Sequence, residues 1–136
     1  MAKLTAIEGI GVTAERRLKA AGIGSTEALL KACCTRRSRR EIASRTALDE
    51  KKLLRFVSHA DLMRIKGVGG EYAELLEASG VDSVPELKQR NAANLREAMV
   101  AANSAKRRRL VRQLPSEEMV TGWVKQAKRL GRKVVR

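Results

Sequence analysis

The stretch that decides the fold is IEGIGVTAERRLKAAGIGSTEALL at residues 7–30, because it returns 58 residues later as IKGVGGEYAELLEASGVDSVPELK at residues 65–88. The agreement holds at one fixed offset, which indicates an internal duplication. Apolar character is kept where residues differ, as in the pair Ile10 and Val68. The identical pairs are Gly9 and Gly67, Gly11 and Gly69, Leu18 and Leu76, Ala20 and Ala78, Gly22 and Gly80, Ser25 and Ser83, and Leu29 and Leu87.

The duplication extends to a closing segment in each copy, where Phe56 corresponds to Trp123 at a slightly larger offset. We expect these two aromatic residues to anchor the core. Each repeat then holds a glycine-rich hairpin, a capped second helix, a basic third helix and a long closing helix. The repeats span residues 1–63 and 64–130, and a basic tail follows at 131–136. No Gly-, Ser- or Pro-rich linker separates the repeats, so we expect them to pack as one compact body.

Helical spacing dominates the apolar pattern, which predicts an all-α fold. β-branched and aromatic residues never alternate over a useful length, as a half-buried strand would require. Gly22 and Gly80 stand where a C′ glycine ends a helix. Ser83 and Glu86 have the spacing of a capping box, and Ser116 can cap the last long helix.

Charge is the strongest global property of the chain. Its 136 residues include 29 Lys and Arg against 15 Asp and Glu, a formal net charge of +14. This excess favours polyanionic partners, with nucleic acid first and acidic membrane surfaces or acidic proteins after it.

Several classes of protein and of site are excluded. No apolar run approaches the roughly 20 residues that cross a bilayer, and Glu8 interrupts the first apolar stretch, so we expect no signal peptide. The single histidine, His59, and the adjacent Cys33 and Cys34 supply too few ligands for a zinc site, and we expect no metal or other cofactor. Adjacent, unpaired cysteines fit a reducing, cytoplasmic location. We expect buried thiols and a surface or capping histidine.

At residues 7–11 (IEGIG) and 65–69 (IKGVG) the chain resembles the helix-hairpin-helix motif, in which a hydrophobic-Gly-hydrophobic-Gly turn joins two short helices. The resemblance implies positive φ at the glycines and uncovered backbone amides at the start of the following helix. The helix dipole also favours an anion there. A DNA phosphate can approach such amides, and contacts of this kind carry no base information.

The two hairpins differ in packing and in charge. The second has Ala73 where the motif uses a small residue for close helix contact, whereas the first has Glu15. The helix after the first hairpin carries bases and the helix after the second carries acids, namely Arg16, Arg17 and Lys19 against Glu71, Glu74 and Glu77. We therefore expect the first hairpin to touch nucleic acid and the second to be partly structural. A turn that packs and binds nothing is the alternative for either copy.

Nearly the whole chain resembles a bacterial family of tandem helix-hairpin-helix proteins classed under a domain-of-unknown-function heading. The resemblance runs through residues 3–11 (KLTAIEGIG), 40–69 (REIASRTALDEKKLLRFVSHADLMRIKGVG) and 114–130 (LPSEEMVTGWVKQAKRL). Residues 72–90 are also similar to the C-terminal domain of the RNA polymerase α subunit, and the first repeat to the small N-terminal domain of recombinases. Both relatives bind DNA through helix-hairpin-helix backbones, which implies DNA by analogy of fold.

Two further functions carry less weight. Residues 42–57 (IASRTALDEKKLLRFV) have the look of a helix-turn-helix, but side chains that read base edges are scarce there, so we expect a packing turn. DNA glycosylases with this hairpin place a catalytic Lys two residues after its second glycine. Here Thr13 and Glu71 hold those positions, and we expect no enzymatic activity.

These observations predict a non-catalytic, largely sequence-independent nucleic-acid-binding protein. Duplex DNA is favoured because two hairpins related by a pseudo-twofold axis can straddle a minor groove. The alternative is a helical adaptor whose basic face meets an acidic protein partner. The sequence does not separate DNA from RNA or fix the oligomeric state. The residues expected to bind DNA are Gly9, Ile10, Gly11, Thr13, Arg16, Arg17, Lys19, Arg36, Arg37, Arg39, Arg40, Gly67, Val68, Gly69, Gly70, Lys106, Arg107, Arg108 and Arg109.

Overall fold

The computed structural model describes residues 2–105 and 110–136, and every regular element within these residues is a helix. The all-α prediction is therefore confirmed for this part of the chain. The elements in chain order are the 3-10 helix η1 (Leu4–Ala6) and the α-helices α1 (Val12–Ala20), α2 (Thr26–Ala32), α3 (Arg36–Thr46), α4 (Glu50–Leu62), α5 (Gly70–Ala78), α6 (Val84–Leu87), α7 (Ala92–Ala105) and α8 (Glu117–Arg129).

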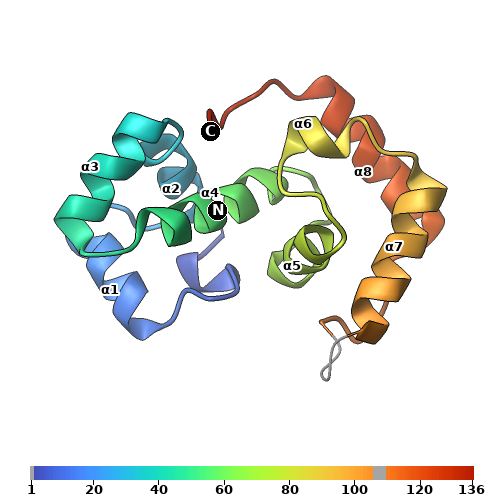
Figure 1. The fold of residues 1–136 in the computed structure, drawn as a ribbon, viewed down its shortest axis with the longest axis horizontal. Coiled ribbons are helices and arrows are strands. Elements are labelled where there is room, and N and C mark those ends of the chain that lie inside the picture. Colours follow the sequence, from blue (N-terminus) through green and yellow to red (C-terminus); the bar gives the residue numbers. More distant parts are fainter. Residues whose placement is uncertain (1, 106–109) are drawn as a thin grey trace. The chain divides into compact units, whose positions relative to one another are not determined.

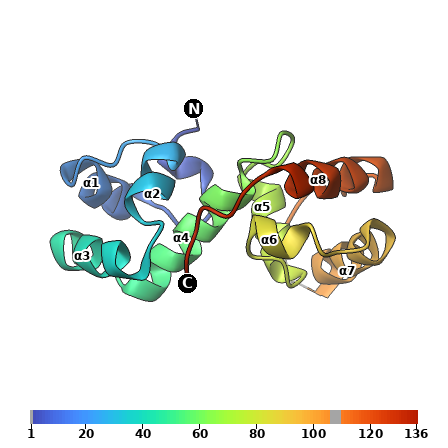
Figure 2. The same cartoon turned by 90° about the horizontal axis from the view of Figure 1, so that it is seen from above.

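The chain divides into two compact units. Unit 1 is Met1–Asp61 together with Lys133–Arg136, and unit 2 is Leu62–Arg132. Unit 1 thus contains η1, α1, α2, α3 and nearly all of α4, and unit 2 contains α5 to α8. The last four residues belong with unit 1, and the end of the chain lies beside α4 in both views of Figures 1 and 2. Unit 1 is therefore built from two separate stretches of sequence.

Unit 1 packs its short helices around one long one. α1 and α2 both contact α3, and the three gather along α4 (Figures 1 and 2). Burial of apolar side chains is the main stabilising contribution to such a unit. Its buried apolar residues include Leu4, Ile7, Ile10, Leu18, Ile23, Leu29, Ile42, Leu53, Phe56 and Val57.

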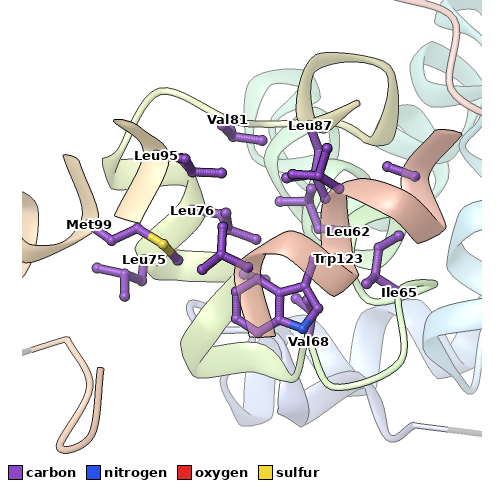
Figure 3. Packing of buried hydrophobic residues seen from close by; sticks show 14 of the residues in the cluster. Leu62, Ile65, Val68, Leu75, Leu76, Val81, Leu87, Leu95, Met99 and Trp123 are labelled. Carbon is purple, nitrogen blue, oxygen red and sulfur yellow. The ribbon is translucent and has the colours of Figure 1, made fainter. Parts of the chain in front are cut away.

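Unit 2 has a core to which all four of its helices contribute. α7 packs against α5 and α8, and α6 packs against α8. Figure 3 shows the labelled side chains of these helices converging on one another, with Trp123 of α8 among them. The Trp123 ring also meets Tyr72, with ring centroids 5.3 Å apart and planes tilted by 52°. Phe56 and Trp123 are each 3% exposed, which confirms that both are core residues.

Helix ends follow the sequence signals. The Ser83 hydroxyl accepts a hydrogen bond from the Glu86 amide (3.2 Å), and the Ser116 hydroxyl accepts one from Met119 (3.1 Å). These caps satisfy amides that have no partner within their helix. Gly22 lies just after α1 with φ 86°, as a helix-ending glycine does. Within the described residues, no helix has both the length and the apolar character needed to cross a membrane.

One prediction about an individual residue is wrong. His59 is fully buried in α4, not at the surface or at a cap. The reason is that residues 56–62 of α4 are all buried. A helix segment enclosed on every side no longer offers the polar face that an amphipathic pattern presents to solvent.

Candidate nucleic-acid interface

The same tight turn occurs once in each unit. In the first, the Ile10 amide donates to the Ile7 carbonyl (3.2 Å), and in the second the Val68 amide donates to the Ile65 carbonyl (3.1 Å). Gly9 and Gly67 occupy the third position of these turns with φ 98° and 95°. A positive φ at that position is the mark of a type II turn, which is why glycine stands there.

Each turn leads directly into a helix whose N-cap is the second glycine. Gly11 has φ −92° and ψ −171°, and Gly69 has φ −94° and ψ −170°. Both residues are thus extended, so the expectation of positive φ holds only for the first glycine of each pair. Helical hydrogen bonding in α1 begins with the Glu15 amide donating to Gly11 (3.0 Å). The amides of residues 11–14 precede that bond and have no partner within the helix.

This geometry changes which amides can meet an anion. Sequence reasoning assigned Ile10 and Val68 to phosphate binding, but their amides donate inside the turns and their side chains are buried. The candidates for contact with an anion are instead the first three of the unpartnered amides, those of Gly11, Val12 and Thr13. Val12 is 70% exposed, so its side chain does not cover this end of α1.

A polar side chain from the closing helix holds each turn, and we name this contact the closing-helix clamp. In unit 1, Arg55 of α4 donates from Nη1 to the Glu8 carbonyl (2.9 Å). In unit 2, Gln126 of α8 accepts from the Lys66 amide (2.9 Å) and donates to the Lys66 carbonyl (3.2 Å). Glu8 and Lys66 are equivalent positions of the repeat, so both turns are fixed at the same point by different residues.

Side chains of the closing helix also lie close to the first glycine of each turn. A methyl group on Gly9 would lie 2.7 Å from Nη1 of Arg55 and 3.4 Å from the Phe56 ring. A methyl group on Gly67 would lie 3.1 Å from Nε1 of Trp123. At Gly11, by contrast, no described atom lies within 4 Å of such a methyl group.

The two hairpins carry opposite charge on the helices that follow them. At matched positions, Arg16 corresponds to Glu74 and Lys19 to Glu77. The charges within the turns are the other way round, with the acidic Glu8 in the first turn and the basic Lys66 in the second. On α1, Lys19 pairs with Glu15 (3.5 Å). The Lys19 side chain is 58% exposed, and a pair of this kind contributes roughly 0–1 kcal/mol.

α3 presents its arginines along its length, not at one point. Arg37 pairs with Glu41 (3.7 Å) and Arg40 with Glu50 (3.8 Å), and all four side chains are exposed. The Arg17 guanidinium reaches the Ala47 carbonyl just after α3 (3.4 Å). Because α3 runs from residue 36 to 46, its first turn lies about 15 Å from that contact. Arg17 of α1 therefore contacts the end of α3, while the arginines in the first half of α3 lie further along that helix.

Arg39 is not one of these exposed arginines. It is 4% exposed, and its guanidinium donates from Nη1 to the Cys33 carbonyl (3.0 Å) and from Nη2 to the Val135 carbonyl (2.7 Å). Burial lowers the pKa of the guanidinium, while the Cys33 thiol acts in the opposite direction. Its spacing from Ile42 and Thr46, at i+3 and i+7, is the sequence signal that places Arg39 on the inner face of α3.

Other expected site residues fall outside this geometry. Lys106, Arg107, Arg108 and Arg109 lie outside the described residues. The chain on their far side is held by Asn103 of α7, whose side-chain oxygen accepts from the amides of Leu110 (2.8 Å) and Val111 (3.1 Å).

Sequence reasoning missed the base that contacts the first turn. Arg55 of the clamp directly precedes Phe56. The alignment of Phe56 with Trp123 was therefore the sequence signal that could have placed Arg55 near the core and the first turn. Lys51 and Lys52 lie one helical turn before Arg55 on α4 and are exposed. Within residues 2–105 and 110–136, no three His, Cys, Asp or Glu side chains lie together as a metal site.

Comparison with known proteins gives a family for the chain. A family model described as Domain of unknown function (DUF4332) matches residues 8–130. No curated protein and no solved structure matches the chain.

Proposed function

We propose that the chain, which belongs to the DUF4332 family, is a non-catalytic protein that binds double-stranded DNA largely without regard to sequence. In this proposal each unit is a helix-hairpin-helix repeat. The first hairpin grips a phosphate, the bases of α1 and α3 bind its neighbours, and the protein acts inside the cell.

The observation that carries the proposal is the start of α1. Its amides at Gly11, Val12 and Thr13 have no intrahelical partner, and the N-cap glycine has no side chain to cover them. Arg55 donates a hydrogen bond to the turn before them. Amides at a helix N-terminus, aided by the helix dipole, suit a phosphate oxygen. Backbone amides do not read bases, so this contact is insensitive to sequence.

Aromatic content favours a duplex over a single strand. Proteins that bind single strands usually stack bases on exposed aromatic rings. The chain has one Phe, one Trp and one Tyr. Phe56 and Trp123 are buried, and Tyr72 is half-buried with its hydroxyl donating to the Gln113 carbonyl (3.0 Å). No ring is left as a stacking platform.

The test is a fluorescence anisotropy titration of a labelled duplex of about 25 base pairs at several salt concentrations. We expect the logarithm of the affinity to fall linearly with the logarithm of salt, by about 0.9 per phosphate contact. Unlabelled duplex of another sequence should compete equally, and single strand should compete less well. Absence of binding at low salt would contradict the proposal and favour an acidic protein partner for the basic surface.

A matched pair of variants separates the hairpin from general positive charge. In Gly11→Asp, the carboxylate caps the helix and so preserves or raises stability by a few tenths of a kcal/mol, yet it occupies the phosphate position. We expect affinity for the duplex to fall at least roughly tenfold, since a lost charged hydrogen bond amounts to about 1.5–3 kcal/mol. Gly69→Asp makes the same change at the acidic second hairpin and should change affinity less than about twofold. Equal losses in the two variants would contradict the assignment to the first hairpin.

A further inference from the structure

Unit 1 holds an extended stretch of chain in a defined seat. We name it the terminal seat and define it by Cys33, Cys34, Arg39 and Ser58. The segment 133–136 occupies it. The contacts are the Val135 amide donating to the Cys34 carbonyl (2.7 Å), Arg39 Nη2 donating to the Val135 carbonyl (2.7 Å) and Arg136 Nη2 donating to the Ser58 hydroxyl (3.0 Å).

The seat is built around a buried charge that needs a carbonyl oxygen. Arg39 is 4% exposed, and one of its two acceptors is the carbonyl of Cys33, the residue that directly follows α2. The other acceptor is the Val135 carbonyl. If segment 133–136 left, the guanidinium would lose that acceptor, and a donor that loses its partner is unfavourable wherever water does not replace the carbonyl oxygen. The seat therefore favours being filled by an extended chain.

The contacts define the chemistry of what fills it. Both main-chain groups of Val135 are bonded, while its side chain is 53% exposed, so almost any residue suits that position. The side chain before it, Val134, is 5% exposed and needs to be small and apolar. The residue after it, Arg136, donates to Ser58. The fitting ligand is an extended peptide with an apolar residue, an unrestricted residue and an arginine in succession.

We propose that the terminal seat is a peptide-binding site that accepts segment 133–136 from a second copy of the chain in exchange for the chain's own. Every contact described above lies within these four residues, so recognition does not depend on which copy supplies them. The preceding residues 131 and 132 are exposed and outside any helix, and they belong with unit 2. Exchange of one terminal element between identical chains is a common route to dimers.

The test uses the full chain with Val134→Asp, in which the chain's own segment no longer seats. The probe is a synthetic peptide of residues 131–136, followed by NMR on the amides of residues 33–35 and the Arg39 side chain. We expect saturable shifts, with an affinity for the peptide at least tenfold higher than in the wild-type chain. In the wild-type chain the chain's own segment competes with the peptide at a high effective concentration. A peptide carrying the same Val134→Asp change should give no saturable shift. Equal shifts from both peptides, or none from either, would overturn the proposal.

Exchange between copies is tested separately by analytical ultracentrifugation. The wild-type chain should form a dimer fraction that grows with concentration, and Val134→Asp should not. A wild-type chain that stays monomeric at all concentrations would overturn exchange even if the peptide binds. If Val134→Asp fails to fold, as judged by circular dichroism, Val134→Ala weakens the same contact and serves in both experiments. Neither readout involves nucleic acid, so the outcome is independent of the proposed function.

Discussion

At the scale of single residues, Gly9 and Gly11 stand two positions apart and meet different requirements. Gly9 combines a positive φ with a methyl position only 2.7 Å from the Arg55 guanidinium. Gly11 is extended and open on the side of its missing side chain. Gly9→Ala should therefore lower the free energy of unfolding by about 1–3 kcal/mol.

Gly11→Ala is the matched control for that substitution. It should lower the free energy of unfolding by only about 0.5 kcal/mol, because alanine is a poorer N-cap than glycine but meets no close neighbour and no positive φ at this position. Urea denaturation of both variants makes the measurement. Equal destabilisation by the two changes would show that the turn is not the constrained element described here.

Ala47 directly follows α3 and has φ 58°. Among the described residues it is the one non-glycine residue with a positive φ. A side chain in this left-handed region is disfavoured by about 1 kcal/mol relative to glycine. Ala47→Gly should therefore raise the free energy of unfolding by about 0.5–1 kcal/mol, seen as a higher midpoint of urea unfolding. Ala43→Gly, inside the same helix, should lower it by about 1 kcal/mol. If both substitutions destabilise, the left-handed assignment at Ala47 is contradicted.

The two adjacent cysteines should behave differently. Burial raises the pKa of the Cys33 thiol from 9.0 to about 11, whereas Cys34 is partly exposed. A disulfide-exchange reagent at pH 8 should therefore modify one thiol quickly in the native chain and both in denaturant. Rapid modification of both native thiols would contradict the burial of Cys33.

The raised pKa of Cys33 also gives stability a pH dependence. The folded chain keeps this proton at pH values where the unfolded chain releases it. The stabilisation is therefore complete below pH 9 and is lost as pH rises from 9 to 11. Because other groups titrate in the same range, the comparison is with Cys33→Ala. That variant should lose less stability than wild type over the interval, and an identical loss would contradict the assignment.

At the scale of elements, α3 begins with a charge arrangement that opposes its own dipole. Arg36 and Arg37 occupy its first turn, and no acidic residue lies there. Bases at a helix N-terminus are unfavourable by about 0.3–1 kcal/mol each. Arg36→Glu should therefore raise the free energy of unfolding while weakening duplex binding several-fold, with a salt slope smaller by about one contact. Weaker binding with an unchanged slope would mean that Arg36 makes no phosphate contact.

The sequence predicted the elements better than the partners of individual side chains. Periodicity and the cap signals at Gly22 and Ser83 specify helix positions because they depend on neighbours within one turn. The burial of Arg39 and His59 depends on residues distant in sequence, such as Val135 for Arg39. The availability of the hairpin amides could not be predicted from residue types either. The Ile10 amide is used by a hydrogen bond within the turn, and that bond follows from backbone geometry.

At the scale of the whole molecule, each unit contains the same tight turn followed by a helix, and the charges of the two following helices differ. In the proposed function this difference gives the two turns different roles. The net charge of +14 is a property of the full chain, but it alone predicts only attraction to polyanions. The proposed function is more specific, with the phosphate contact made by three amides at the start of α1.

The most direct test of that claim is an NMR titration of the isotope-labelled full chain with a short DNA duplex. The amide signals of Gly11, Val12 and Thr13 should shift most among backbone amides, and those of Gly69, Gly70 and Glu71 should shift little. Shifts that appear chiefly at the second hairpin, or that are confined to Lys and Arg side chains, would contradict the account.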